Sequence, residues 1–345
     1  GDCTGPISSQ FVLKDPTVDF AVLECARGGI LKNGLAFRNC DVAIVTNISA
    51  DHIGLGGIDS MEQMAKVKAV VPETVSKHGY AILHAADDLV FAMQKGLNCN
   101  VALFSMDENN PRIIKKKKKG GYAAVFENGY ITIMKGTWKI RVIKVTEVPV
   151  TYGGKALHNI MNCLPAVLST YFWRNIEIED IKLALQTFIP SASQTPGRLN
   201  MFQFKHFKFL VDFAHNPAGL ELLCDFISKM DGDPKVGIIS GTGDRRDEDI
   251  MELGRISGRS FDEIIIRQDK NLRGRTAEEI VNLLVKGINE TKPRDIPITI
   301  IYNEKEAIMH AYNTAKPGSL ITIMCDVVAE ALDLIKALKE KEDNE

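Results

Sequence analysis

Residues 208–217 read Lys-Phe-Leu-Val-Asp-Phe-Ala-His-Asn-Pro, a short apolar run that stops at polar residues and a proline. Such a run is typical of a strand buried on both faces of a parallel sheet. The run Val236–Ser240 behaves in the same way and is followed by Gly-Thr-Gly-Asp-Arg-Arg. Apolar runs that end in polar turns and precede helical patterns predict an α/β fold.

The same alternation continues to the end of the chain. Further strands are predicted near residues 262–266, 297–302 and 319–324, and each is followed by a helical pattern. These elements predict a doubly wound domain of about 150 residues, which is a common domain size.

The first half of the chain predicts a second α/β domain. The expected elements are strands at residues 18–24, 41–47 and 80–83 and helices at residues 61–76, 156–173 and 178–188. Between residues 120 and 148 the apolar period changes to two, with turn signals at Asn128-Gly129 and Lys135-Gly136, which indicates a small antiparallel insert. The polar stretch 190–197 has the composition of a linker, so we predict domains at 1–190 and 191–345.

Composition excludes several classes of protein. The chain is 45% hydrophobic and 25% charged with a net charge of -2, which suits two ordinary cores and gives no bulk reason to expect nucleic acid or a membrane as partner. Apolar stretches are too short to span a bilayer and the start has no signal pattern, so we predict a cytoplasmic protein. The seven scattered cysteines include no C-x-x-C pair and are interpreted as reduced thiols. Because the chain opens on Gly1 without a methionine, we expect a fragment.

Polar clusters follow four predicted strands. In open α/β sheets, ligands bind beyond the carboxyl ends of the strands, so these clusters are the first candidates for a site. They are Glu24 to Gly29, Thr46-Asn47 with Asp51-His52, Asp212 to Pro217, and Gly241 to Asp247. Each also has an ordinary structural interpretation. Asn216-Pro217, for example, equally suits a helix cap followed by a first helical proline.

In combination these residues carry a resemblance. The order of the motifs resembles the signature of the Mur ligase superfamily, and it covers most of the chain. The matching positions are Thr46-Asn47, Asp51-His52, Lys68, Gly154, His158-Asn159, Asn162, Gly197-Arg198, Asp212 and His215-Asn216-Pro217. The resemblance implies a central ATPase domain, a C-terminal Rossmann-like domain, and an ATP-dependent, Mg²⁺-requiring ligase that makes amide bonds through an acyl phosphate.

Four segments resemble one subgroup of the superfamily more closely. They are residues 1–6, 23–31, 51–57 and 269–275. In that subgroup the ligase attaches arginine to the β-carboxylates of a poly-aspartate chain, so the resemblance implies arginine and an acidic peptide or polymer as substrates.

The resemblance also assigns roles in the first domain. Glu24 and His52 are implied Mg²⁺ ligands, and oxygen ligands are those that Mg²⁺ prefers. Lys68 matches a lysine that the superfamily carbamylates into a further metal ligand, with Lys66 as the competing candidate. His158, Asn159 and Asn162 are implied to hold the adenine side of ATP.

Roles in the second domain follow from the same match. Arg198 matches an arginine that reaches nucleotide phosphate, and Asp212 is implied to lie at the ribose. His215, Asn216, Asp244, Arg245 and Arg246 are implied substrate contacts, with a solvated charge cluster as the alternative for the last three. Arg273 and Arg275 are assigned no role beyond possible contact with the acidic chain.

One family motif is absent from the sequence. No G-x-x-x-x-G-K-[ST] phosphate loop occurs between residues 1 and 345. We therefore expect the chain alone neither to bind ATP tightly nor to turn over. We also expect the first strand and helix of the central domain to be missing, which would leave an open sheet edge or an exposed apolar face. The subgroup further carries an upstream ATP-grasp domain, of which nothing is seen here.

The five consecutive lysines Lys115–Lys119 are the densest charge in the chain. They are interpreted as a solvated loop, with a cationic loop that holds an acidic polymer as the alternative.

Three other functions remain open. The first is a peptidoglycan Mur ligase or a folylpolyglutamate-type ligase, against which residues 24–29 and 269–275 argue. The second is a non-catalytic remnant that binds an acidic peptide, supported by the absent phosphate loop. The third is a nicotinamide-dependent oxidoreductase, which rests only on the doubly wound domain, and a fold alone does not specify function. A homo-oligomer is a further possibility.

Overall fold

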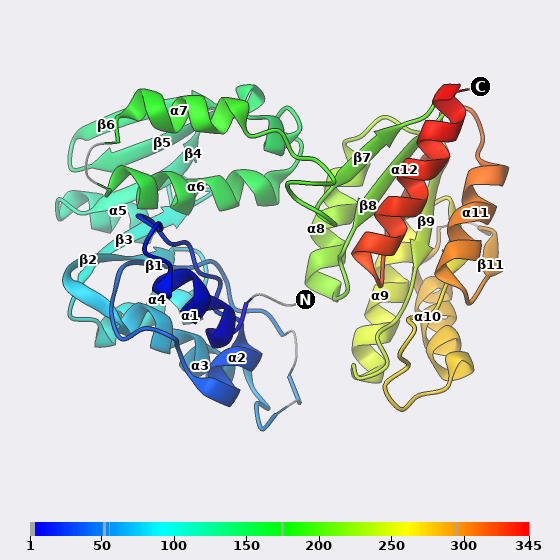
Figure 1. Cartoon of the computed structure of the whole chain (residues 1–345), viewed down its shortest axis with the longest axis horizontal. Helices are drawn as coiled ribbons and strands as arrows, with labels where there is room; N and C mark the ends of the chain where they lie inside the picture. The colour runs from blue at the N-terminus through cyan, green and yellow to red at the C-terminus, as the bar shows by residue number, and fades with distance from the viewer. Residues whose placement is uncertain (1–3, 51–52, 55, 174–175, 294, 345) are drawn as a thin grey trace. The chain divides into compact units, whose positions relative to one another are not determined.

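The computed structural model describes residues 4–50, 53–54, 56–173, 176–293 and 295–344. The chain divides into two compact units, Gly1–Thr187 and Phe188–Glu345 (Figure 1). Both are α/β units built on mostly parallel six-stranded sheets, which confirms the predicted fold class. The domain limits 1–190 and 191–345 stay a prediction. No helix in the described ranges is long and apolar enough to cross a membrane.

Unit 1 is built on a sheet whose strands follow one another in sequence order, β1-β2-β3-β4-β5-β6. Its strands are β1 (Cys40–Val45), β2 (Val75–His84), β3 (Asn100–Ser105), β4 (Tyr122–Glu127), β5 (Tyr130–Lys135) and β6 (Trp138–Lys144). The first four are parallel, and β4, β5 and β6 form two antiparallel hairpins. The predicted antiparallel segment is therefore present, but it extends the main sheet instead of forming a separate insert.

Helices cover both faces of this sheet. They are α1 (Pro6–Lys14), α2 (Arg27–Asn33), α3 (Met61–Glu73), α4 (Asp88–Ala92), α5 (Pro111–Lys118), α6 (Leu157–Tyr171) and α7 (Ile178–Thr187), with short 3-10 turns at Met93–Gly96, Val145–Glu147 and Pro149–Thr151. Buried side chains of α6 pack with one face of the sheet, and those of α3, α4 and α5 pack with the other. Helix α3 begins at a capping box in which Ser60 and Gln63 satisfy each other's backbone N–H groups.

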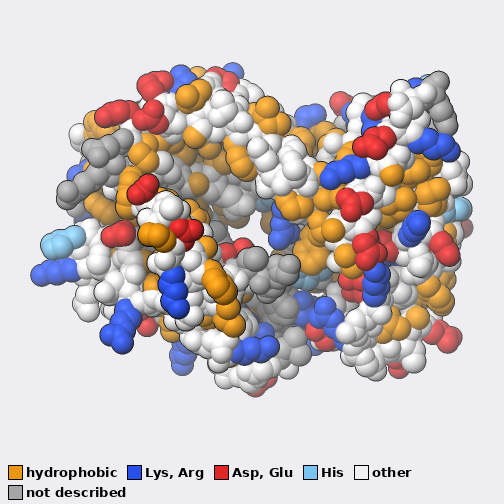
Figure 2. Space-filling view, in the orientation of Figure 1, with side chains coloured by type: hydrophobic (Ala, Val, Ile, Leu, Met, Phe, Trp, Pro, Cys, Tyr) orange, Lys and Arg blue, Asp and Glu red, His pale blue; other side chains and the backbone are white. Residues whose placement is uncertain are grey.

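The predicted strand at residues 18–24 is wrong. This segment has no regular secondary structure, and Val22 and Phe20 are 85% and 53% exposed. A strand needs a neighbour to pair its backbone N–H and C=O groups, and among the described strands β1 pairs only with β2. Hydrophobic side chains accordingly reach the surface over α1 and α2 (Figure 2).

The loop predicted at Lys115–Lys119 is also wrong. Lys115 to Lys118 form the last turn of α5, and Lys119 follows as its C-terminal cap. Cations at a helix C-terminus interact favourably with the helix dipole, which explains why a helix accommodates the run.

Unit 2 has the doubly wound order β11-β10-β9-β12-β8-β7. Its strands are β7 (Asn200–Gln203), β8 (Lys208–Asp212), β9 (Lys235–Ile239), β10 (Glu263–Ile266), β11 (Ile298–Ile300) and β12 (Leu320–Met324). All are parallel except the edge strand β7. The helices are α8 (Pro217–Ser228), α9 (Asp247–Ser260), α10 (Ala277–Thr291), α11 (Glu304–Thr314) and α12 (Val328–Asn344).

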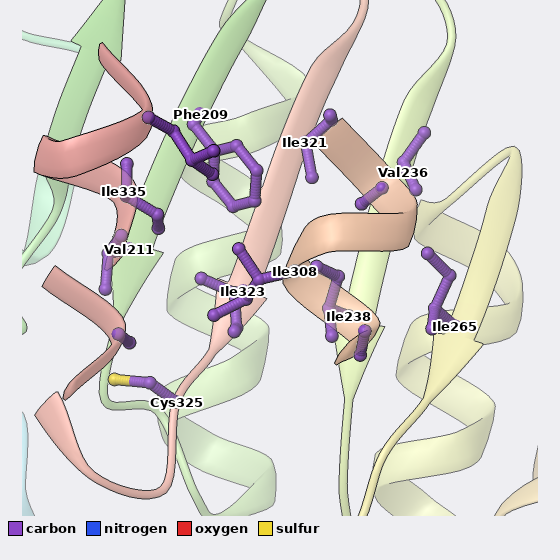
Figure 3. Close-up of a cluster of buried hydrophobic side chains, with 14 of the residues drawn as sticks. Phe209, Val211, Val236, Ile238, Ile265, Ile308, Ile321, Ile323, Cys325 and Ile335 are labelled. Carbon is purple, nitrogen blue, oxygen red and sulfur yellow. The ribbon is translucent and has the colours of Figure 1, made fainter. Parts of the chain in front are cut away.

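The core of unit 2 lies between its sheet and two helices. Phe209, Ile238 and Ile323 of the central strands pack against Ile308 of α11 and Ile335 of α12 (Figure 3). All five side chains are at most 1% exposed. Helices also lie behind the sheet in the view of Figure 3, so both faces of the strands are covered, as their continuous apolar runs indicate.

Helices α9 and α10 approach so closely that only glycine fits at the contact. A Cβ atom on Gly287 would overlap the carbonyl oxygen of Met251, and one on Gly254 would overlap that of Leu284. A Cβ atom on Gly258 would lie 2.7 Å from the carbonyl oxygen of Ile288. The three glycines therefore set the distance between these helices.

We predict that Gly287→Ala destabilises unit 2 by about 1–3 kcal/mol, because the added methyl must push two backbones apart. The measurement is the urea midpoint followed by circular dichroism. Gly96→Ala is the control, since open space surrounds Gly96. An unchanged midpoint for Gly287→Ala would show that the two helices can separate at no cost.

Candidate functional site

A large groove in unit 1 brings together four of the predicted residues of that unit. It has a volume of about 1520 Å³ and lies among the segment from Thr4 to Asn33, the strand β1 with the loop that follows it, and the end of α6. Glu24, Thr46, Asn47 and Lys68 all line it. Thr46 and Asn47 follow directly after Val45, the last residue of β1, so the groove includes the carboxyl end of that strand.

The position of Lys68 follows from the face of α3 on which it lies. Met64, Lys68 and Val71 share one helix face at i, i+4 and i+7 and all three line the groove. Met64 is 2% exposed and fixes this face against the core. The Lys68 Nζ donates to the carbonyl oxygen of Asn47 at 3.3 Å. Lys66 is exposed and is not among the lining residues, so the geometry distinguishes the two candidate lysines.

Oxygen donors for a cation are present in this groove. The Glu24 carboxylate is exposed, and Thr46 and Asn47, which carry a hydroxyl and an amide oxygen, also line the groove. These are hard donors of the kind that suit Mg²⁺, which retains several waters. Asp51 and His52 lie outside the described residues. Among the residues that are described, no three His, Cys, Asp or Glu side chains come together as a metal site.

Asp87 holds the loop after β1, and the sequence analysis gave it no role. Its Oδ2 accepts from the Ile48 backbone N–H at 2.7 Å, and its Oδ1 accepts from that of Val90 at 3.0 Å. It thus ties the loop after β1 to the start of α4. Asp87 lies just beyond the strand that ends at His84, and this position in the sequence could have indicated its role.

The three predicted adenine-side residues lie on the first turns of α6. Asn159 donates from Nδ2 to the carbonyl oxygen of Val150 at 2.7 Å, which anchors the helix to the preceding turn. Asn162 is exposed one turn further on, and His158 is half-buried. The helix brings Asn159 and Asn162 onto one face, but the amide of Asn159 already has a structural partner.

Asp212 in unit 2 shapes the turn that carries Arg198. Its carboxylate is buried and accepts from the backbone N–H groups of Leu199 at 2.9 Å and Ala214 at 2.8 Å. Burial raises the pKa of Asp212, and these backbone hydrogen bonds oppose the shift. The guanidinium of Arg198 lies 5.7 Å from the centre of the Phe213 ring, on the exposed side of the turn.

The neighbouring residues His215 and Asn216 have local partners. The Nδ1 of His215 lies 3.0 Å from the carbonyl oxygen of Phe213. Asn216 caps α8 by accepting from the Gly219 N–H at 2.8 Å, with Pro217 in the first turn. The structural interpretation of Asn216-Pro217 is therefore correct, whatever else these residues contact.

The loop after β9 is held by the two arginines that had no assigned role. Arg273 donates to Asp244 at 2.6 Å, and Arg275 donates to the carbonyl oxygens of Gly243 and Arg245, both at 2.9 Å. Arg245 is 8% exposed. Arg246 makes two hydrogen bonds to Asp249 at the start of α9. Asp244 and Arg246 are thus engaged within the unit.

A buried ionic network lies at the carboxyl ends of the strands of unit 2, and the sequence analysis did not predict it. Arg267 is 1% exposed, donates to Asp269 at 2.6 Å and to the carbonyl oxygen of Met324, and its Nε lies 3.1 Å from Glu304. Ser240 donates to the same Asp269 at 3.0 Å. Burial raises the pKa of Glu304, and Arg267 opposes that shift. The sequence feature that indicates this network is an arginine immediately after the apolar run that ends at Ile266.

Family models match both units. The Mur ligase middle domain matches residues 4–170, and the Mur ligase, glutamate ligase domain matches residues 197–326. Together they cover most of the chain.

Curated relatives extend this match. The chain is 45% identical over 339 residues to cyanophycin synthetase of Synechocystis sp. and 46% identical over 336 residues to that of Geminocystis herdmanii. These alignments cover 98% and 97% of the chain but only 38% of each relative. The chain therefore spans well under half the length of the relatives it matches.

A solved structure supports the fold. E. coli FolC in complex with DHPP and ADP superposes with a TM-score of 0.63 at 16% identity, over 87% of this chain and 62% of that one. From the two family domains and the identity along nearly the whole sequence, the chain belongs to the Mur ligase family and is related to cyanophycin synthetase.

Proposed function

We propose that this chain is the Mur ligase part of an ATP-dependent enzyme that joins arginine to the side-chain carboxylates of a poly-aspartate chain. The observation that carries the proposal is the groove of unit 1, because Glu24, Thr46, Asn47 and Lys68 line it together at the end of β1. The relationship to cyanophycin synthetase supports the choice of substrates.

The proposed reaction brings several negatively charged groups together. The γ-phosphoryl group of ATP is transferred to a carboxylate oxygen and ADP leaves. The arginine amine then attacks the acyl carbon, the C–O bond to phosphate breaks, and the amine loses a proton. Because ATP, carboxylate and acyl phosphate are all anionic, catalysis depends on cations and positioning. Mg²⁺, when bound, would neutralise phosphate charge in this groove.

Residues of this chain would position the reacting groups and the cation. Lys68 is held against the Asn47 carbonyl at one wall, while Glu24 lies on the segment that forms another. Asp87 fixes the loop between Asn47 and α4 through the Ile48 N–H. We propose Glu24 as a direct or water-mediated cation ligand and a carbamylated Lys68 as a second one. The roles implied for His158, Asn162, Arg198 and Arg245 stay proposals of the same kind.

We further propose that a strand followed by a phosphate loop occupies part of this groove in the whole protein. The volume of about 1520 Å³ exceeds the roughly 300–1,000 Å³ of a small-molecule pocket. Ile44 on β1 is 37% exposed, and Phe20 and Val22 across the groove are more exposed still. A strand laid along β1 would bury these side chains and give residues 18–24 a neighbour to pair with.

We predict that the 345-residue chain alone releases no phosphate from ATP. Adding in front of it the segment that precedes the matched region in Synechocystis cyanophycin synthetase should restore phosphate release. The added segment should also slow hydrogen exchange at the β1 amides Val42 and Ile44. A matched control replaces the phosphate-loop lysine of the added segment by alanine, which should keep the slow exchange but abolish turnover. Steady phosphate release by the unextended chain would contradict the proposal.

In the extended protein we predict that Lys68→Ala lowers kcat roughly 10- to 100-fold, the loss typical of groups that tune a metal site. Formate or acetate should restore part of the activity by replacing the lost carboxylate. Lys66→Ala is the control and should leave kcat within about twofold, because Lys66 does not line the groove. Full activity of Lys68→Ala would remove Lys68 from the mechanism.

The substrate assignment predicts that arginine, and not glutamate or diaminopimelate, forms amides on poly-aspartate in the extended protein. Mass spectrometry of the polymer after incubation with ATP would identify the product, with lysine as the control for a cation of different shape. Transfer of diaminopimelate to a nucleotide-linked peptide would instead support the peptidoglycan alternative.

A further inference from the structure

The C-terminal end of α5 concentrates positive charge that the described residues leave without counter-charge. No ion pair joins Lys115–Lys119 to any acid in the described part of the chain. At the first turn of the same helix, by contrast, Arg112 pairs with Asp88. The lysines also repel one another: burial and the charge of Lys119 both lower the pKa of Lys116.

Three of these lysines share one exposed helix face. Lys115, Lys118 and Lys119 are exposed, and the last two stand at i+3 and i+4 from Lys115, so their Cβ atoms lie about 5–6 Å from that of Lys115. The stem of Lys116 lies over Gly121 at the beginning of β4, which fixes the helix end against the sheet. We call Lys115, Lys118 and Lys119 the lysine face.

The same end of the sheet carries a further cation. Lys135 pairs across the hairpin with Tyr122, the first residue of β4, and its Nζ lies 4.5 Å from the centre of the Tyr122 ring. Its Nζ also lies 3.3 Å from the Tyr122 hydroxyl. Lys135 is exposed and is directly paired with Trp138, which is 42% exposed. Tyr122 packs with the α6 side of the sheet, so Lys135 adds positive charge at the same strand end but on the face opposite α5.

This surface lies away from the candidate active groove. The groove includes the carboxyl end of β1, whereas the lysine face adjoins the beginning of β4, and β1 to β4 are parallel. Six residues of strand separate the two ends of such a sheet by about 20 Å. A ligand on the lysine face is thus too far from Lys68 to react and can only be held there.

We propose that the lysine face binds an acidic polypeptide, a chain of closely spaced carboxylates, outside the catalytic groove. Side chains on one side of an extended peptide recur about every 6.6 Å, close to the spacing of the three lysines. Lysine offers point charges that suit single carboxylates, and the face includes no guanidinium fork and no row of stacked aromatic rings of the kind that single-stranded nucleic acids use. The choice of an acidic chain rests on the proposed function, in which such a chain is the substrate.

The test is binding of fluorescently labelled poly-L-aspartate to the full 345-residue chain without ATP, followed by anisotropy. The triple variant Lys115→Gln, Lys118→Gln, Lys119→Gln should lose about tenfold or more in affinity and most of its salt dependence. The matched control removes the same charge from three exposed lysines of unit 2, as Lys205→Gln, Lys305→Gln and Lys316→Gln, and should bind within about twofold of the parent.

Further experiments distinguish loss of the lysine charges from a folding defect and from non-specific binding of polyanions. Arginine at the three positions should restore binding, which shows that charge and not a folding defect was lost. Equal loss in both triple variants would overturn the proposal, and so would competition by an oligothymidylate of the same charge at equal strength. Because no ATP is present, polymer binding without arginine ligation by the extended protein would reject the proposed function only. Ligation by the extended protein without such binding by the chain would reject this inference only.

Discussion

Backbone pairing at the edge of the first sheet is the constraint on which the candidate site depends. A strand with an unpaired edge leaves a row of N–H and C=O groups to solvent or to another segment. Within the described residues β1 pairs on one side only, and residues 18–24 stand apart from it as an irregular segment. The space between them is the groove that Glu24, Asn47 and Lys68 line. The strand proposed for the whole protein would pair with β1 and fill part of this space.

In the second unit the strands that carry the candidate residues are paired and covered, and their ends are linked by buried charges. Its strands are paired except at the edges β7 and β11, and both faces are covered. The carboxyl ends of the strands then hold a buried network in which Arg267 links Asp269, Glu304 and the end of β12. Removing one partner from such a network leaves a buried charge unpaired, which typically costs several kcal/mol. Through the hydrogen bond from Ser240 to Asp269, this network also holds the end of β9, which precedes the loop that carries Asp244.

Helices and strands were predicted correctly where the sequence has a clear helical repeat or a continuous run of apolar residues. Examples are α3, α6 and all the parallel strands of unit 2. The errors have one cause. Residues 18–24 have the composition of a buried strand, but pairing needs a neighbour that composition does not reveal. The lysine run has the composition of a solvated loop. Because Ile113 packs into the core, helix α5 forms here and includes most of the lysines. In both cases a contact distant in sequence decided the local structure.

The sequence by itself determined the α/β class, the order of the family's motifs and the residues at the strand ends, because these depend on local hydrophobic period and on residue type. Only the tertiary structure decided which of those residues meet. It brought Lys68, not Lys66, to the groove through the face of α3 that Met64 anchors. It also buried Arg267 between two acids, Asp269 and Glu304, and the carbonyl oxygen of Met324. Spatial proximity across a sheet is set by strand order and helix packing, and neither can be read from spacing along one chain.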